Sequence, residues 1–87
     1  MSISHNEILY NNFMEISLRL KELRLENGVT QKQLASKLNI KQNTYSQYES
    51  GQRQIPLNTL AELSMFYDVS VDYLLNLTDS ETPYPRK

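Results

Sequence analysis

Neutral hydrogen-bonding side chains are concentrated in one short stretch of the chain, IKQNTYSQYESGQ at residues 40–52. If this stretch is a helix, with 100° between successive residues, its amides and hydroxyls fall within an arc of about 140°. Gln and Asn place a donor beside an acceptor, the fork that binds N6 and N7 of adenine in the major groove. The polar strip therefore suggests a surface that reads base edges, and it consists of Gln42, Asn43, Ser46, Gln47 and Ser50.

Composition and projection leave two other interpretations of this strip open, a solvated polar face and a protein-binding face. The spacing around it favours DNA. Thr30 and Gln33 form a capping box that begins a helix over residues 31–38. Asn39 then favours a left-handed turn, and the polar helix follows about four residues later. A capped helix, a tight turn and a second helix are the parts of a helix-turn-helix, whose second helix presents its N-terminal residues to the major groove.

Three further helices are expected to hold this pair in place. Apolar residues spaced four and three apart between Leu9 and Leu23 predict a helix that ends near Gly28. Its start is open: residues 4–7 fit a capping box, but the weak helix formers at 11 and 12 also allow the regular part to begin only near Phe13. Pro56 suits the first turn of a fourth helix, and Ser70 caps a fifth. No stretch alternates with period two, so we expect an all-α fold without a sheet.

Composition argues against several classes of protein, among them enzymes, disulfide-stabilised proteins and membrane proteins. The 87 residues suit one domain, and the absence of cysteine excludes disulfides and thiolate metal sites and fits a cytoplasmic location. His5 stands alone, without a carboxylate pair or a nucleophile and base, so we expect no enzyme, no metal and no cofactor. The start of the chain has no basic segment followed by a long apolar run, which argues against secretion and against a membrane protein.

Charge is unevenly distributed along the chain, although the formal total is only −1. Residues 30–54 carry four cations and one carboxylate, and residues 55–85 carry five carboxylates and no cation. A polyanion would meet the basic middle with the acidic end turned away. Chance fluctuation in a small protein is the competing explanation. The cations of the basic block are Lys32, Lys37, Lys41 and Arg53.

The stretch TQKQLASKLNIKQNTYSQYESGQRQIPLNTLAELSMFYDVSVDYLL resembles the phage-repressor and Cro type (XRE-like) of helix-turn-helix domain. The resemblance is distributed over many positions and covers residues 13–77. It implies a five-helix lambda-repressor-like bundle. Residues 1–12 would be an N-terminal extension that can be helical, and residues 78–87 a flexible polar tail.

The resemblance also implies roles for individual residues. Those at Gln42, Asn43 and Gln47 would contact bases, with Ser46 beside them on the strip. Contacts to phosphates are implied for Gln31, Lys41, Thr44 and Arg53, and Lys32 and Lys37 join them because of their charge. Arg24 and Glu49 match a structural salt bridge between the first and third helices. The chain departs from the family pattern at Asn39, where Gly is frequent, and at Tyr45 and Tyr48, where aliphatic residues are usual; the tyrosine hydroxyls are expected to reach the surface.

The function implied is that of a sequence-specific double-stranded DNA-binding transcriptional regulator, expected to be a repressor and a homodimer on a palindromic operator. The alternative is an antitoxin or another regulatory protein-interaction module, and a protein partner or anti-repressor is compatible with both. Two surfaces are candidates for the dimer interface, and the first could equally fill the core. They are Met65, Phe66 and Tyr73 in the fourth and fifth helices, and Ile8, Leu9 and Tyr10 near the N-terminus.

Overall fold

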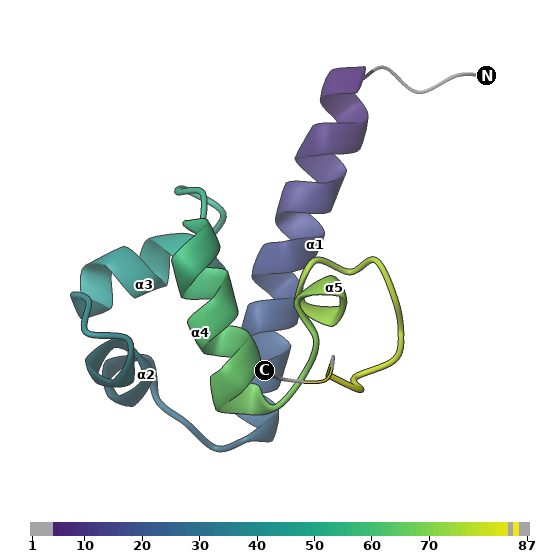
Figure 1. Cartoon of the computed structure of the whole chain (residues 1–87). Helices are drawn as coiled ribbons and strands as arrows, with labels where there is room; N and C mark the ends of the chain where they lie inside the picture. Colours follow the sequence, from purple (N-terminus) through teal and green to yellow (C-terminus); the bar gives the residue numbers. More distant parts are fainter. Residues whose placement is uncertain (1–4, 84, 86–87) are drawn as a thin grey trace.

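The computed structural model describes residues 5–83 and residue 85, with side chains described from Glu15 onward. This part of the chain forms five helices and no strand, which confirms the all-α prediction. The helices α2 and α3 lie together at one side of the molecule, and α5 with the segment that follows it lies at the other (Figure 1). In chain order the helices are α1 (His5–Glu26), α2 (Gln31–Lys37), α3 (Gln42–Glu49), α4 (Leu57–Tyr67) and α5 (Val71–Leu74).

Capping hydrogen bonds and left-handed residues mark the helix boundaries that the sequence predicts. At the start of α2, Oγ1 of Thr30 accepts from the Gln33 amide at 3.0 Å, and the Gln33 side chain accepts from the Thr30 amide at 2.9 Å. Asn39 has φ 57° and Gly28 has φ 65°, so both adopt the left-handed conformation that ends a helix. Oγ of Ser70 accepts from the Tyr73 amide at 3.0 Å and caps α5.

The first helix has the earlier of the two starts that the sequence leaves open. It is continuous from His5 and does not begin only near Phe13. Asn11 and Asn12 have weak helix propensity, but each costs only a few tenths of a kcal/mol, roughly, which a long helix tolerates. The N-terminal part of α1 extends beyond the other helices (Figure 1). The side chains of Ile8, Leu9 and Tyr10 lie outside the described residues.

The core joins all five helices. Tyr45 is fully buried and Tyr48 is 4% exposed, and their rings meet edge to face with centroids 6.3 Å apart. Such aromatic pairs contribute about 1 kcal/mol beyond the area that they bury. Ala35 is small enough to let α2 and α3 approach closely. The buried residues of this core are Leu20, Leu23, Leu34, Ala35, Leu38, Tyr45, Tyr48, Leu63, Val69 and Leu74.

The short helix α5 is fastened to α1 by polar contacts. The guanidinium of Arg19 lies over the ring of Tyr73, 4.1 Å from its centroid, and also donates to Oδ1 of Asn76. Asn76 in turn donates to Glu15 at 2.9 Å. The segment after α5 folds back, since the Ser70 amide donates to the Glu81 carbonyl at 3.1 Å. The ring of Tyr73, a candidate for the dimer interface, therefore packs against Arg19 of the same chain.

Candidate nucleic-acid interface

The segment from α2 to α3 has the geometry of a helix-turn-helix. The four residues Leu38–Lys41 connect the two helices, and the Ile40 amide donates to the Ala35 carbonyl at 3.0 Å, which tightens the turn. Leu38 is buried and Ile40 packs against the core. The turn is thus fixed by its own hydrogen bonds and by apolar anchors, which sets the direction in which α3 leaves it.

The two sides of α3 differ as the projection predicts. Gln42 and Asn43, in its first turn, are exposed, whereas Tyr45 and Tyr48 are buried behind them. Gln47 is half-buried one turn further along. Ser46 is also half-buried and lines a shallow hollow with Arg24 and Glu49, so it lies at the edge of the polar strip.

Arg24 on α1 binds Glu49, the last residue of α3. Its Nε donates to Glu49 Oε2 at 2.6 Å and its Nη2 donates to Oε1 at 3.2 Å. The side chains are only 13% and 5% exposed, respectively. Burial would raise the pKa of Glu49, but hydrogen bonds, above all from Arg24, outweigh it and hold that pKa below the ordinary value. The salt bridge implied by the resemblance is present.

Tyr45 departs from expectation in one respect. Its hydroxyl does not reach the surface: it is buried near Glu49 without a hydrogen bond of acceptable geometry. Burial, followed by the neighbouring carboxylate, raises the pKa of Tyr45. The hydroxyl of Tyr67 is likewise buried without a hydrogen bond. The interior behind α3 therefore contains the Tyr45 hydroxyl beside the Arg24–Glu49 ion pair and the Tyr67 hydroxyl without a hydrogen-bond partner.

The residues expected at phosphates are spread around α3. Lys32, Lys37, Lys41 and Arg53 are all exposed. No side chain caps the N-terminus of α3, so its first amide groups remain available to an anion, and Lys41 stands at that position. Thr44 is half-buried in the first turn of α3. Gln31 is half-buried and its amide donates to Glu49 Oε1 at 3.3 Å, which gives it a structural contact that the sequence did not reveal.

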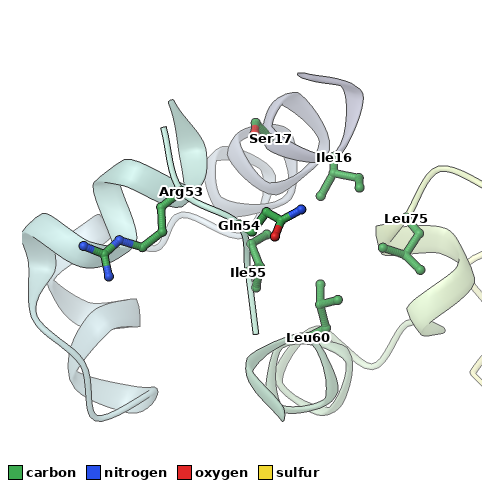
Figure 2. Close-up of a pocket in the computed structure, with 7 residues that line it drawn as sticks. All are labelled: Ile16, Ser17, Arg53, Gln54, Ile55, Leu60 and Leu75. Atoms are coloured by element: carbon green, nitrogen blue, oxygen red, sulfur yellow. The ribbon is translucent and has the colours of Figure 1, made fainter. Parts of the chain in front are cut away.

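Arg53 lies in the loop between α3 and α4 and contacts the polar strip. Its Nε donates to Oε1 of Gln47 at 2.8 Å. The loop also borders a pocket of about 260 Å³, and the Arg53 side chain runs away from that pocket while Ile55 lies at it (Figure 2). The lining of the pocket is mostly apolar and comes from α1, the loop, α4 and the residue after α5, namely Ile16, Ser17, Arg53, Gln54, Ile55, Leu60 and Leu75.

The described part of the chain contains neither a metal-type cluster of side chains nor a membrane-spanning helix. Among residues 5–83 and 85, no three His, Cys, Asp or Glu side chains come together as a metal site would require. None of the helices described there is both long enough and apolar enough to cross a membrane.

Comparison with known proteins gives one consistent result. A helix-turn-helix family model matches residues 20–74. The regulator YobD of Bacillus subtilis is 45% identical over 65 residues, covering 75% of this chain and 58% of YobD. The regulator ImmR of the same organism is 50% identical over 62 residues, covering 71% and 49%. The cryptic phage CTXphi transcriptional repressor RstR of Vibrio cholerae is 34% identical over 71 residues, covering 82% and 62%.

Solved structures are similar as well. The restriction-modification controller protein C.AhdI from Aeromonas hydrophila superimposes with a TM-score of 0.68 and 28% sequence identity, covering 75% of this chain and 94% of C.AhdI. The present chain spans 49% to 62% of the length of the three curated relatives named above.

Proposed function

Because the chain belongs to the helix-turn-helix family of the phage-repressor and Cro type, we propose that it binds double-stranded DNA sequence-specifically and regulates transcription. The DNA-binding unit in this proposal is residues 13–77. Gln42, Asn43 and Gln47 contact base edges, with Ser46 at the margin of the contact. We infer repression because RstR, a relative over 82% of the chain, is named a repressor.

The exposure of Gln42 and Asn43 is the observation that carries the proposal. Both stand in the first turn of α3, the part of a helix-turn-helix that enters the major groove. The opposite side of the same helix is fixed by buried tyrosines and by the Arg24–Glu49 ion pair. A rigid support of this kind suits base recognition, because a hydrogen bond to a base edge discriminates only when its donor is held in place.

Cations around α3 supply the remaining binding energy. Lys41 and Arg53 flank α3, Lys32 and Lys37 lie on α2, and Gln31 and Thr44 are the uncharged phosphate ligands in this proposal. Phosphate contacts set affinity and register but carry no sequence information. With four such cations, affinity for non-specific DNA is modest and falls steeply with salt.

A homodimer is part of the proposal, since one module contacts only a few base pairs. Two-fold dimers of this class bind half-sites about one helical turn apart, roughly 34 Å. Met65 and Phe66 on α4 are 56% and 37% exposed and form the candidate interface. Sedimentation equilibrium tests it: Phe66→Glu shifts the protein to the monomer, whereas Leu25→Glu, at an exposed position on α1, leaves the dimer intact.

Selection from a pool of random duplexes tests the proposed function directly. The expected result is a palindromic consensus containing A·T positions, because the amides of Gln42 and Asn43 suit adenine. Gln42→Ala then reduces discrimination at its base pair by about 1–3 kcal/mol. Lys41→Ala weakens binding to all sequences alike and lowers the slope of log K against log salt by about 1.

The competing function is that of an antitoxin or other protein-interaction module that uses the same fold. It predicts no enriched sequence in the selection and no mobility shift at low salt with DNA from upstream of the protein's own gene. Arg24 and Glu49 have the same structural role whether the partner is DNA or a protein. Variants of the polar strip, and not of the ion pair, therefore distinguish the two functions.

A further inference from the structure

The hydrogen bond between Arg53 and Gln47 has a consequence for base choice, which rests on the proposed function. Arg53 Nε donates to Gln47 Oε1 at 2.8 Å. A guanidinium carries donors only, so the amide atom that faces it must be the oxygen. The amide NH2 of Gln47 is then the group left to make other contacts.

The loop that carries Arg53 is itself fixed to the end of α3. The Gln52 amide donates to the Gln47 carbonyl at 2.9 Å, and Ile55 packs against the core. Figure 2 shows Ile55 at the apolar pocket and the Arg53 side chain extending in the opposite direction. Backbone and side-chain contacts therefore both hold the guanidinium beside Gln47.

We propose that Arg53 orients the Gln47 amide so that its NH2 faces the DNA, and that Gln47 therefore selects a keto base, guanine or thymine. Guanine offers O6 and N7 as acceptors and thymine offers O4, all in the major groove. Adenine and cytosine present amino donors at the equivalent place. The two-point contact with adenine would need Gln47 Oε1 to accept from N6, but Arg53 already uses one of the two lone pairs of that oxygen and its guanidinium stands beside it.

Arg53 then contributes both to base choice, through Gln47, and to phosphate binding. An arginine has five N–H donors, and the bond to Gln47 uses one of them, so the remaining donors can still contact a phosphate. Within the described part of the chain no guanidinium donates to Gln42 or Asn43, so both amide functions of each remain for adenine. Gln47 thus selects keto bases, whereas Gln42 and Asn43, with the same amide group, can select adenine.

The test uses the sequence that the full chain selects from random duplexes, with each base pair of one half-site then replaced in turn. Fluorescence anisotropy measures binding. The wild-type protein is expected to prefer a keto over an amino base about tenfold on the contacted strand at one position. Gln47→Glu keeps the size of the side chain but offers acceptors only, so it reverses that preference towards cytosine or adenine.

Arg53→Met is the decisive variant, with Lys41→Ala as its matched control. Both remove one exposed cation and weaken binding to every sequence. Only Arg53→Met releases the Gln47 amide, so the keto-to-amino ratio at that position falls towards unity as adenine becomes acceptable. If Arg53→Met has no more effect on the keto-to-amino ratio than Lys41→Ala has, the inference is wrong while the proposed function stands. Failure of the wild-type protein to enrich any sequence overturns the proposed function itself.

Discussion

Arg24 and Glu49 are joined by a two-point ion pair that connects α1 to the last residue of α3. Arg24 also donates to the Val29 carbonyl at 3.1 Å, so the same guanidinium fixes the start of the segment leading into α2. Besides the shared apolar core, this arginine therefore fixes the orientation of the helix-turn-helix relative to α1, and its contribution can be measured.

Glu49→Gln is expected to lower the free energy of unfolding by about 3 kcal/mol, because it leaves the largely buried guanidinium of Arg24 without its counter-charge. Urea unfolding followed by circular dichroism measures the change. Glu22→Gln on the exposed side of α1 is the control and should change stability by less than about 0.5 kcal/mol. Equal small effects of the two variants would show that the ion pair contributes nothing measurable.

Stability should also fall in acid, in a range that Glu49 sets. Its pKa in the folded protein lies below the ordinary 4.5. The unfolded chain then binds the proton more tightly, so the stabilisation is complete above about pH 5 and is lost as the pH falls through the lowered pKa. Unfolding midpoints between pH 7 and pH 3 measure this loss. In Glu49→Gln the pH dependence should be shallower, and an unchanged slope would assign it to other carboxylates.

Tyr67→Phe is expected to raise the free energy of unfolding by about 1 kcal/mol, since it removes a buried hydroxyl that has no hydrogen-bond partner. Tyr73→Phe provides the comparison, because that hydroxyl makes only an exposed 3.4 Å contact with Glu81. Its effect should be near zero. A loss of stability in Tyr67→Phe would mean that the hydroxyl has a favourable contact.

The two buried tyrosine hydroxyls should resist ionisation in alkali until the protein unfolds. Burial raises the pKa of Tyr67 to about 12 and that of Tyr45 further, from an ordinary value of 10.0. The resulting stabilisation is complete below pH 10 and is lost as the pH rises above it, because only the unfolded chain ionises readily there. Ultraviolet titration should show at least two of the six tyrosines ionising late, together with unfolding. Ionisation of all six near pH 10 in the folded protein would contradict this.

Asn39 offers a test of the turn. Its φ of 57° is left-handed, so Asn39→Ala should cost about 1 kcal/mol while Asn39→Gly should be neutral or slightly stabilising. Thermal unfolding of the two variants measures the difference. The same loss in both would assign it to the Asn39 side chain and not to the backbone.

Features that depend on a few neighbouring residues could be predicted from the sequence. The capping box at Thr30, the left-handed turn at Asn39 and the cap at Ser70 each involve residues no more than three apart. The outward side of α3 was also predictable, because helical periodicity alone places Asn43 and Tyr45 on opposite sides of the helix. These signals need no knowledge of the rest of the fold.

Contacts between distant residues could not be predicted in this way. The position of Arg19 over Tyr73 depends on how α5 docks on α1, and nothing local to either residue encodes that docking. The bond from Arg53 to Gln47 depends on the path of the loop after α3. The hydroxyl of Tyr45 was expected at the surface, but close packing of α3 on α1 and α2 left it inside.

The division of α3 into an exposed amide side and a tyrosine-anchored side makes stability and target choice separable properties. Gln42 and Asn43 are exposed, so exchanging them should leave the stability of the bundle nearly unchanged. If the proposed function holds, changing these two residues alone would alter the preferred operator. Retargeting at Gln47 is the exception, because a replacement there must also suit Arg53.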